Sequence, residues 1–208
     1  MLNNANAMEI DEIKNNDGVD AIMEIGFPGG YGFYGVADIL SGEANPSGHL
    51  TDTYAVTNAN SPAAQNFGNY EWTNADPSVN INAEEVEAED IYTGYKYYET
   101  RYADTVLGQG NADATVGSST GKAWNYDDEV SYPFGYGLSY TTFEQTLKSV
   151  DVDLANRTVT AEVDVKNTGD VAGKDVVQLY TSVPYTDYDV ENKVEKSAVQ
   201  LLDYEKQI

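Results

Sequence analysis

Carboxylate side chains are dense in one short stretch of the sequence, between residues 84 and 90. Two carboxyl groups can cleave a glycosidic bond when one acts as an acid and the other as a nucleophile or base. Such a pair must face each other across a sugar ring, which neighbours on one strand or helix do not readily achieve. The alternative is a solvated charged surface, the usual environment of Glu. The residues concerned are Glu84, Glu85, Glu87, Glu89 and Asp90.

Aromatic side chains offer a second route to sugar binding, because a flat ring packs well against the apolar face of a pyranose. Residues 91–102 hold five of the 17 tyrosines. The alternative is packing of these rings in a core or an interface between domains, where aromatic side chains dominate. Three residues are kept as candidates for substrate binding: Trp72, Tyr92 and Trp124.

Two further features carry weaker signals. Residues 27–32 read FPGGYG before an expected helix, where backbone N–H groups can cradle a phosphate, but the full Gly-rich fingerprint is absent. A plain strand-to-helix turn is the alternative. His49, the single histidine, titrates near neutral pH and could act as an acid or base. Because the sequence identifies no partner for it, a structural histidine is the alternative, and no catalytic residue is assigned.

Metal and cofactor chemistry finds little support in the residue types. The chain has no cysteine and one histidine, which excludes disulfides, thiolate zinc sites and a histidine cluster. Residues 15–18 are too short a match to a calcium loop. We therefore expect no metal site.

The elements that must position these residues differ along the chain. A short helix is expected around residues 8–14, and the apolar run 21–25 predicts a strand buried in a sheet. The apolar spacing from Phe33 to Leu40 predicts an amphipathic helix, which Gly42 ends. Residues 45–90 and 108–122 are expected to be loops, since they are rich in turn-forming residues.

The last third of the chain has the sequence pattern typical of a β-protein. Residues 158–165 alternate apolar and polar side chains, which predicts a half-buried strand. The turn-forming stretch 167–170 separates it from a second strand over residues 175–182. Two antiparallel strands joined by a short turn indicate part of a β-sandwich.

The balance of acidic and basic residues changes at the same place as the sequence pattern. The 208 residues carry a formal net charge of −24; residues 1–138 hold 22 acids and 4 bases, and residues 139–208 hold 13 acids and 7 bases. This length allows one or two domains, and we place a boundary near Ser139. The acid excess argues against a nucleic-acid partner and an anionic membrane surface. No membrane span or signal peptide is visible, and the compartment stays open.

Four segments, in order, resemble glycoside hydrolase family 3, the β-glucosidase family. Residues 35–50 resemble its stretch containing NPSGR, and residues 92–100 its YVGYRYYDT stretch. Residues 132–143 read YPFGYGLSYTTF, and residues 165–180 are similar to VTNTGDVAGKEVVQLY of its fibronectin type III-like domain. Together these matches span nearly the whole chain. Two family arginines are replaced, by His49 and Lys96.

The resemblance implies a fold class and a domain division. Residues 1–138 would be the C-terminal part of an α/β sandwich domain, and residues 139–208 an immunoglobulin-like, fibronectin type III-like β-sandwich lacking its last strands. Both domains would be incomplete. Some family members place the catalytic barrel last, and the opening residues resemble that subgroup, so the domain order of the parent stays open.

The resemblance also implies a function. The family hydrolyses terminal β-D-glucosyl residues with retention, without a cofactor, and its barrel carries the aspartate nucleophile. Since no motif of that barrel occurs here, this piece would buttress the barrel and wall the substrate pocket with loops around 58–90 and 108–126. Its partners would be a β-glucoside, the barrel and, as an option, further copies in a homo-oligomer. The alternative is a stand-alone carbohydrate-binding or adhesion module.

Overall fold

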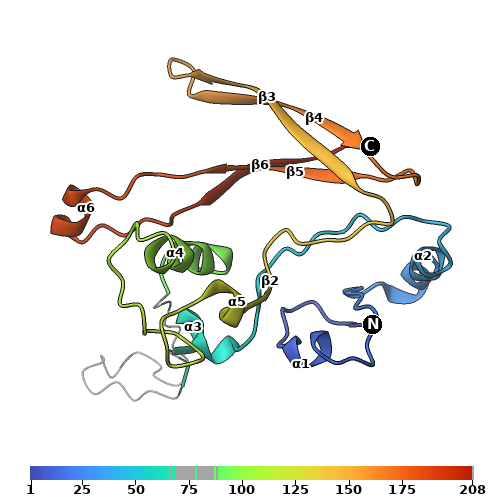
Figure 1. Cartoon of the computed structure of the whole chain (residues 1–208), viewed down its shortest axis with the longest axis horizontal. Coiled ribbons are helices and arrows are strands. Elements are labelled where there is room, and N and C mark those ends of the chain that lie inside the picture. The colour runs from blue at the N-terminus through green and yellow to red at the C-terminus, as the bar shows by residue number, and fades with distance from the viewer. Residues whose placement is uncertain (66, 69–77, 79–86, 88, 208) are drawn as a thin grey trace.

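The residues that the structure describes form short helices and three two-stranded sheets (Figure 1). The structure is a computed structural model that describes residues 1–65, 67, 68, 78, 87 and 89–207. The elements of the first 132 residues are α1 (Asp11–Lys14), α2 (Gly29–Ser41), β1 (Tyr54–Ala55), η1 (Asn58–Asn60), α3 (Pro62–Gln65), α4 (Tyr95–Thr105), α5 (Tyr126–Glu129) and β2 (Val130–Tyr132).

Helix α2 confirms the helix predicted between Phe33 and Leu40 and begins four residues earlier, directly after Pro28. Gly42 ends it with a left-handed backbone, at φ 83°, and donates its N–H to the carbonyl of Ile39. A left-handed residue at this position favours glycine, which has no Cβ to clash. Val36 is the one buried residue of the helix, so most of its apolar side chains face solvent here.

The strand predicted at residues 21–25 is wrong for the described structure. Only an isolated parallel bridge joins Leu2 to Glu24, through hydrogen bonds of Leu2 with Met23 and Ile25. A buried parallel strand needs partners on its edges and helices on its faces. The described residues bring no second partner to this segment, and it is therefore only half-buried.

The core of the first part lies between α4, α5 and the β1–β2 pair. Strands β1 and β2 pair antiparallel, with Ala55 opposite Val130. Behind them a buried cluster forms from Ala55, Tyr98, Trp124 and Val130, with Tyr97, Tyr102 and Tyr126 packed against it. The tyrosine-rich stretch is thus largely a helix, α4, which the sequence analysis did not assign.

Two long ribbons form the second part of the chain and lie one above the other in Figure 1. Strands β3 (Phe143–Asp153) and β4 (Thr158–Asn167) make one, and β5 (Asp175–Thr181) and β6 (Gln200–Gln207) make the other. Strand β4 confirms the predicted alternation, because Ala161, Val163 and Val165 are half-buried and the residues between them are exposed.

The predicted pairing of the two strands across the 167–170 turn is wrong. Strand β4 pairs with β3, and β5 pairs with β6, so the two strands belong to different sheets. The Asn167 side chain donates to the carbonyl of Val171, and a Cβ on Gly169 would lie 2.3 Å from Thr141 Oγ1. The turn is therefore packed against the start of β3 and carries the chain from one sheet to the other.

An 18-residue connection, residues 182–199, joins β5 to β6 and carries α6 (Asp187–Asn192). We call this segment the α6 excursion. It reaches back to α4: the Ala198 N–H donates to Thr100 Oγ1 at 2.9 Å, and the Leu201 N–H donates to the Tyr95 hydroxyl at 2.9 Å. The second part of the chain is thereby tied to the first, and Figure 1 shows α6 beside α4.

Candidate functional site

A cavity of about 670 Å³ opens between α4, residues 109–112 and the α6 excursion. Small-molecule sites commonly have volumes of about 300–1,000 Å³. We call this space the α4–α6 cavity. It is lined by residues from both parts of the chain, which lie far apart in the sequence.

Helix α4 provides the floor of the α4–α6 cavity. Arg101 is buried, and its guanidinium donates to the carbonyls of Asp113 and Val116 at 3.0 and 2.7 Å. One turn further on, burial raises the pKa of the Asp104 carboxyl, against the opposing charge of Arg101. Arg101 thus holds the 108–122 loop against α4 while Asp104 remains at the cavity.

Tyr92 lies at the centre of the candidate region, because it lines both the α4–α6 cavity and a neighbouring cavity of about 360 Å³. Burial raises the pKa of its phenol, and the carboxylates of Glu195 and Asp104 add to that effect. These groups come from three separate segments. Only the folded chain brings them within electrostatic range of one another.

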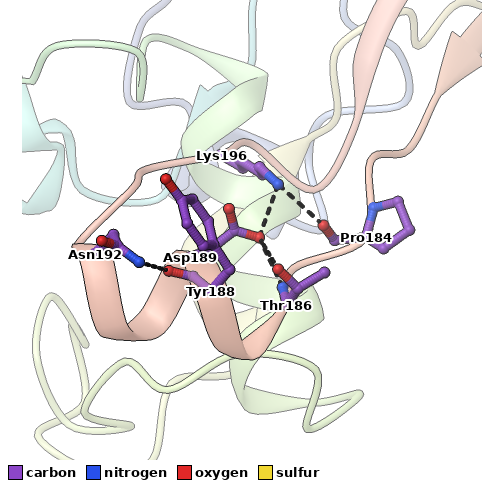
Figure 2. Close-up of polar contacts among 6 residues, drawn as sticks. All are labelled: Pro184, Thr186, Tyr188, Asp189, Asn192 and Lys196. Carbon is purple, nitrogen blue, oxygen red and sulfur yellow. Dashed lines mark hydrogen bonds and ion pairs between the residues drawn. The ribbon is translucent and has the colours of Figure 1, made fainter.

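Figure 2 shows how the α6 excursion is held in shape. The buried Asp189 carboxylate accepts hydrogen bonds from the N–H and hydroxyl of Thr186, both at 2.8 Å, and an ion pair from Lys196 at 2.7 Å. Lys196 also donates to the carbonyl of Pro184 at 3.3 Å. The Asp189 carboxylate therefore binds Thr186 directly at one end of the excursion and Lys196 at the other, and Lys196 in turn binds Pro184.

We expect the α6 excursion to loosen in acid. The hydrogen bond from Lys196, ahead of those from Thr186, lowers the pKa of Asp189 from 3.8 to about 2. A carboxyl whose folded pKa is depressed stabilises the fold above its unfolded value and loses that contribution as pH falls. Urea unfolding between about pH 5 and pH 2 should show Asp189→Asn less stable than the parent, with the gap closing toward about pH 2.

The matched control for this test is Asp187→Asn, which removes an exposed carboxylate from the same helix. It should leave the difference between parent and variant small throughout the acid range. A gap for Asp189→Asn that stays constant down to about pH 2, or one that Asp187→Asn reproduces, would contradict the assignment.

Trp124 lies in the core, 2% exposed, next to Tyr126 and with the Arg101 guanidinium 5.8 Å from its ring centre. Its ring is covered by protein, which favours the packing alternative over sugar stacking. Trp72, the second tryptophan candidate, lies outside the described residues. Of the three candidates, Tyr92 alone lines a cavity in the part of the chain that the structure describes.

The acidic stretch is described only in part, since Glu84 and Glu85 lie outside the described residues. Glu87 and Asp90 are exposed, as expected of a solvated surface. Glu89 is half-buried and lines the smaller cavity beside Asp52 and Tyr92. Among the described residues of this stretch, no two carboxylates face each other across an open space.

The two weaker candidates take structural positions. His49 is half-buried, and a Cβ on Gly137 would lie within 3.2 Å of its ring, so this histidine is packed closely against residues 135–137. Its Nδ1 atom is buried with no hydrogen-bond partner among the described residues. Residues 27–32 form the turn into α2, where Gly29 has φ 61°. His49 therefore fits a structural histidine, and residues 27–32 fit a plain turn into a helix.

The sequence analysis did not foresee the role of Asn45. Its amide donates to the Ala172 carbonyl at 3.0 Å, and its oxygen accepts from the Ser139 hydroxyl at 2.9 Å and the Tyr140 N–H at 2.8 Å. Three of the segments that carry the family resemblance therefore meet at one side chain. The signal for it was the resemblance itself, because nothing in the residue spacing indicates that these segments touch.

The backbones at this meeting point lie very close together. Leu50 and residues 135–136 exchange two hydrogen bonds of 2.8 Å, and a Cβ on Gly137 would lie 2.3 Å from the Gly48 carbonyl oxygen. Glycine is therefore needed at position 137 for reasons of space. We call this meeting point, residues 45–50, 135–141 and 167–173, the Asn45 junction.

The sequence and the fold are both similar to parts of glycoside hydrolases. Residues 1–140 match the glycosyl hydrolase family 3 C-terminal domain. The chain is 32% identical over 203 residues to the β-glucosidase BoGH3A of Bacteroides ovatus, covering 97% of this chain and 22% of that protein. The structure of a β-glucosidase from Paenibacillus barengoltzii matches with a TM-score of 0.68 and 31% identity, over 99% of this chain and 18% of that one.

A third relative was solved with a sugar. The structure of β-glucosidase 3B from Thermotoga neapolitana in complex with glucose matches with a TM-score of 0.53 and 30% identity, over 83% of this chain and 18% of that one. The fold and the sequence therefore place the chain in the class of glycoside hydrolase C-terminal regions, and the chain combines helices and sheets. The chain belongs to glycosyl hydrolase family 3 and spans about a fifth of the length of these relatives.

No described helix combines the length and the apolar character needed to cross a bilayer. No group of three His, Cys, Asp or Glu side chains in the described part of the chain is placed to hold a metal ion.

Proposed function

We propose that these 208 residues are part of a retaining family 3 β-glucosidase and serve to buttress its catalytic barrel and to wall its substrate pocket. The single observation that carries this is the match of residues 1–140 to the family's C-terminal domain, which similarity to several β-glucosidases supports. The two carboxylates of the reaction would come wholly or partly from residues outside this chain.

The domain division proposed from the sequence is 1–138 and 139–208. Support comes from the position of the family match, which stops at residue 140, and from the change to long strands at Phe143. We propose that the two ribbons β3–β4 and β5–β6 are the two facing sheets of a fibronectin type III-like sandwich. Such sandwiches stack antiparallel sheets face to face, and strands next to each other in sequence can belong to opposite sheets.

The pocket-walling role rests on the two cavities. Asn58, residues 61–63 and Glu89 line the smaller cavity, and Gln109, Asn111 and Ala112 line the α4–α6 cavity. Both loop regions expected to wall a substrate pocket therefore border open space. Trp72 and Tyr92 remain the proposed sugar contacts of these walls, of which Tyr92 is described. A family 3 barrel and a β-glucoside are the partners that this role requires.

The 208-residue chain by itself is expected to release no detectable product from an aryl β-glucoside, because retaining hydrolysis needs a nucleophile and an acid/base held about 5–5.5 Å apart. The measurement is chromophore release by the purified chain, compared with a blank and with a full-length family 3 β-glucosidase under the same conditions. Turnover above the blank would contradict the proposal. Addition of a separately expressed barrel from the same protein should restore activity if the buttressing role is correct.

A further inference from the structure

The α4–α6 cavity is built entirely from residues of this chain. Its floor is α4, its rim is formed by residues 109–112 and the α6 excursion, and the excursion is held in place by Asp189. The loop backbone at Gly110 lies directly over Asp104, where a Cβ would meet the carboxylate. The walls are therefore fastened to one another at several points within the described residues.

The groups that converge on this cavity suit hydroxyl-rich ligands. Tyr92 and Tyr185 bring aromatic rings, Asp104 and Glu195 bring carboxylates, and Gln109 and Asn111 bring amides. Asp104, Tyr185 and Glu195 all lie within electrostatic range of the Tyr92 phenol. Carboxylates accept hydrogen bonds from sugar hydroxyls, and amides both accept and donate them, while aromatic faces cover the apolar side of the ring.

The charges at the cavity are nearly balanced, although the whole chain carries −24. Arg101, Lys193 and Lys196 line it together with Asp104 and Glu195, and Asp189 neutralises Lys196. Arg101 is occupied by two backbone carbonyls. Neither an anion nor a cation would gain much from such a site, whereas a neutral polar ligand loses nothing.

We propose that the α4–α6 cavity binds a neutral mono- or disaccharide, with Tyr185 at the rim and Asp104 at the floor as its principal contacts. This proposal rests on the pocket-walling role given above, which already uses Tyr92 and residues 109–112, and deepens it by naming a ligand whose binding requires neither a barrel nor hydrolysis. The volume of the α4–α6 cavity, about 670 Å³, is adequate for a ligand of that size.

The test is a titration of the full 208-residue chain with cellobiose, followed by two-dimensional ¹H–¹⁵N NMR. We expect saturable shifts at amides around the cavity, including those of Gln109, Asn111 and Tyr185. Tyr185→Ala and Asp104→Asn should each weaken the affinity about tenfold, as expected for a lost ring contact or a lost charged hydrogen bond. Glucuronate should bind no more tightly than glucose, because the charges around the cavity are nearly balanced.

The matched control is Tyr188→Ala, which removes an exposed tyrosine from the same excursion without touching the cavity lining. It should leave the affinity unchanged. Tyr185 and Glu195 are exposed, so Tyr185→Ala and Glu195→Gln keep the test open even if Asp104→Asn unfolds. Absence of saturable shifts, shifts that map elsewhere, or equal weakening by Tyr188→Ala would overturn the proposal. None of these outcomes bears on hydrolysis by a longer protein.

Discussion

Trp124→Ala is expected to be the most damaging single substitution in the described part of the chain. The side chain is 2% exposed and packs with Ala55, Tyr98 and Val130, so truncation removes a large apolar contact and leaves a cavity. Replacing a buried Trp by Ala typically costs about 3–5 kcal/mol. Urea unfolding followed by circular dichroism should show a loss of this size, which is a large share of the stability of an ordinary domain.

Trp124→Phe is the control, because it keeps a flat apolar ring and removes only the second ring and an indole N–H that has no partner among the described residues. It should cost clearly less than Trp124→Ala. Equal losses for the two variants would show that the ring is not packed as described, and no loss for Trp124→Ala would contradict its place in the core.

Alkaline titration gives a second readout of the same core. Burial raises the pKa of Tyr98 above its ordinary value of 10.0, and it does the same for Tyr126, where the hydrogen bond to Glu99 adds to the effect. A phenol with a raised folded pKa stabilises the fold fully below about pH 10 and loses that contribution as pH rises further. In Trp124→Ala these phenols should ionise closer to pH 10.0, seen as phenolate absorbance at lower pH than in the parent.

Asn45→Ala is expected to be the second most damaging change, because it removes three hydrogen bonds at once. The Asn45 side chain joins Ala172 to Ser139 and Tyr140, so three separate segments, its own included, are connected at this point. At about 1 kcal/mol for each bond, the loss should be about 2–3 kcal/mol. Calorimetry should show a lower transition temperature, and protease cleavage between β2 and β3 should become faster as the Asn45 junction opens.

Two controls separate the junction from general effects on stability. Asn45→Asp keeps the oxygen that accepts from Ser139 and Tyr140 but places a carboxylate against the Ala172 carbonyl, so an intermediate loss is expected. Asn15→Ala removes an exposed amide bonded only to Asp11 and should cost little. Similar losses for Asn15→Ala and Asn45→Ala would contradict the special place of Asn45.

Short-range patterns predicted the elements that they describe. Helix α2 ends where Gly42 was expected to end it, and β4 follows the alternation of residues 158–165. Helix α4 was missed, because its sequence is rich in tyrosine and lacks a clear apolar stripe. Its tyrosines pack on several sides, against Trp124 and Tyr126 on one and Phe134 and Tyr180 on another.

Pairings between distant segments were the point at which prediction from sequence failed. The strand at 21–25 and the pairing of β4 with β5 were both wrong, since each depends on which edge is free after the rest of the chain has folded. The residues of a strand indicate that it has two faces and two edges, but they do not indicate which other segments cover those faces and edges. The same reason explains why Trp124 was held as a sugar contact although it lies in the core.

The sequence by itself determined the family, the acidic character and the positions of the elements with strong local periodicity. Only the tertiary structure decided which side chains meet: Asn45 with Ser139, Tyr140 and Ala172, Asp189 with Lys196, and Tyr92 with Asp104 and Glu195. Helix and strand propensities act over a few residues, and so they can be read along the chain. Contacts between segments more than 90 residues apart, such as Asn45 with Ser139, follow from packing of the whole chain, which no local pattern encodes.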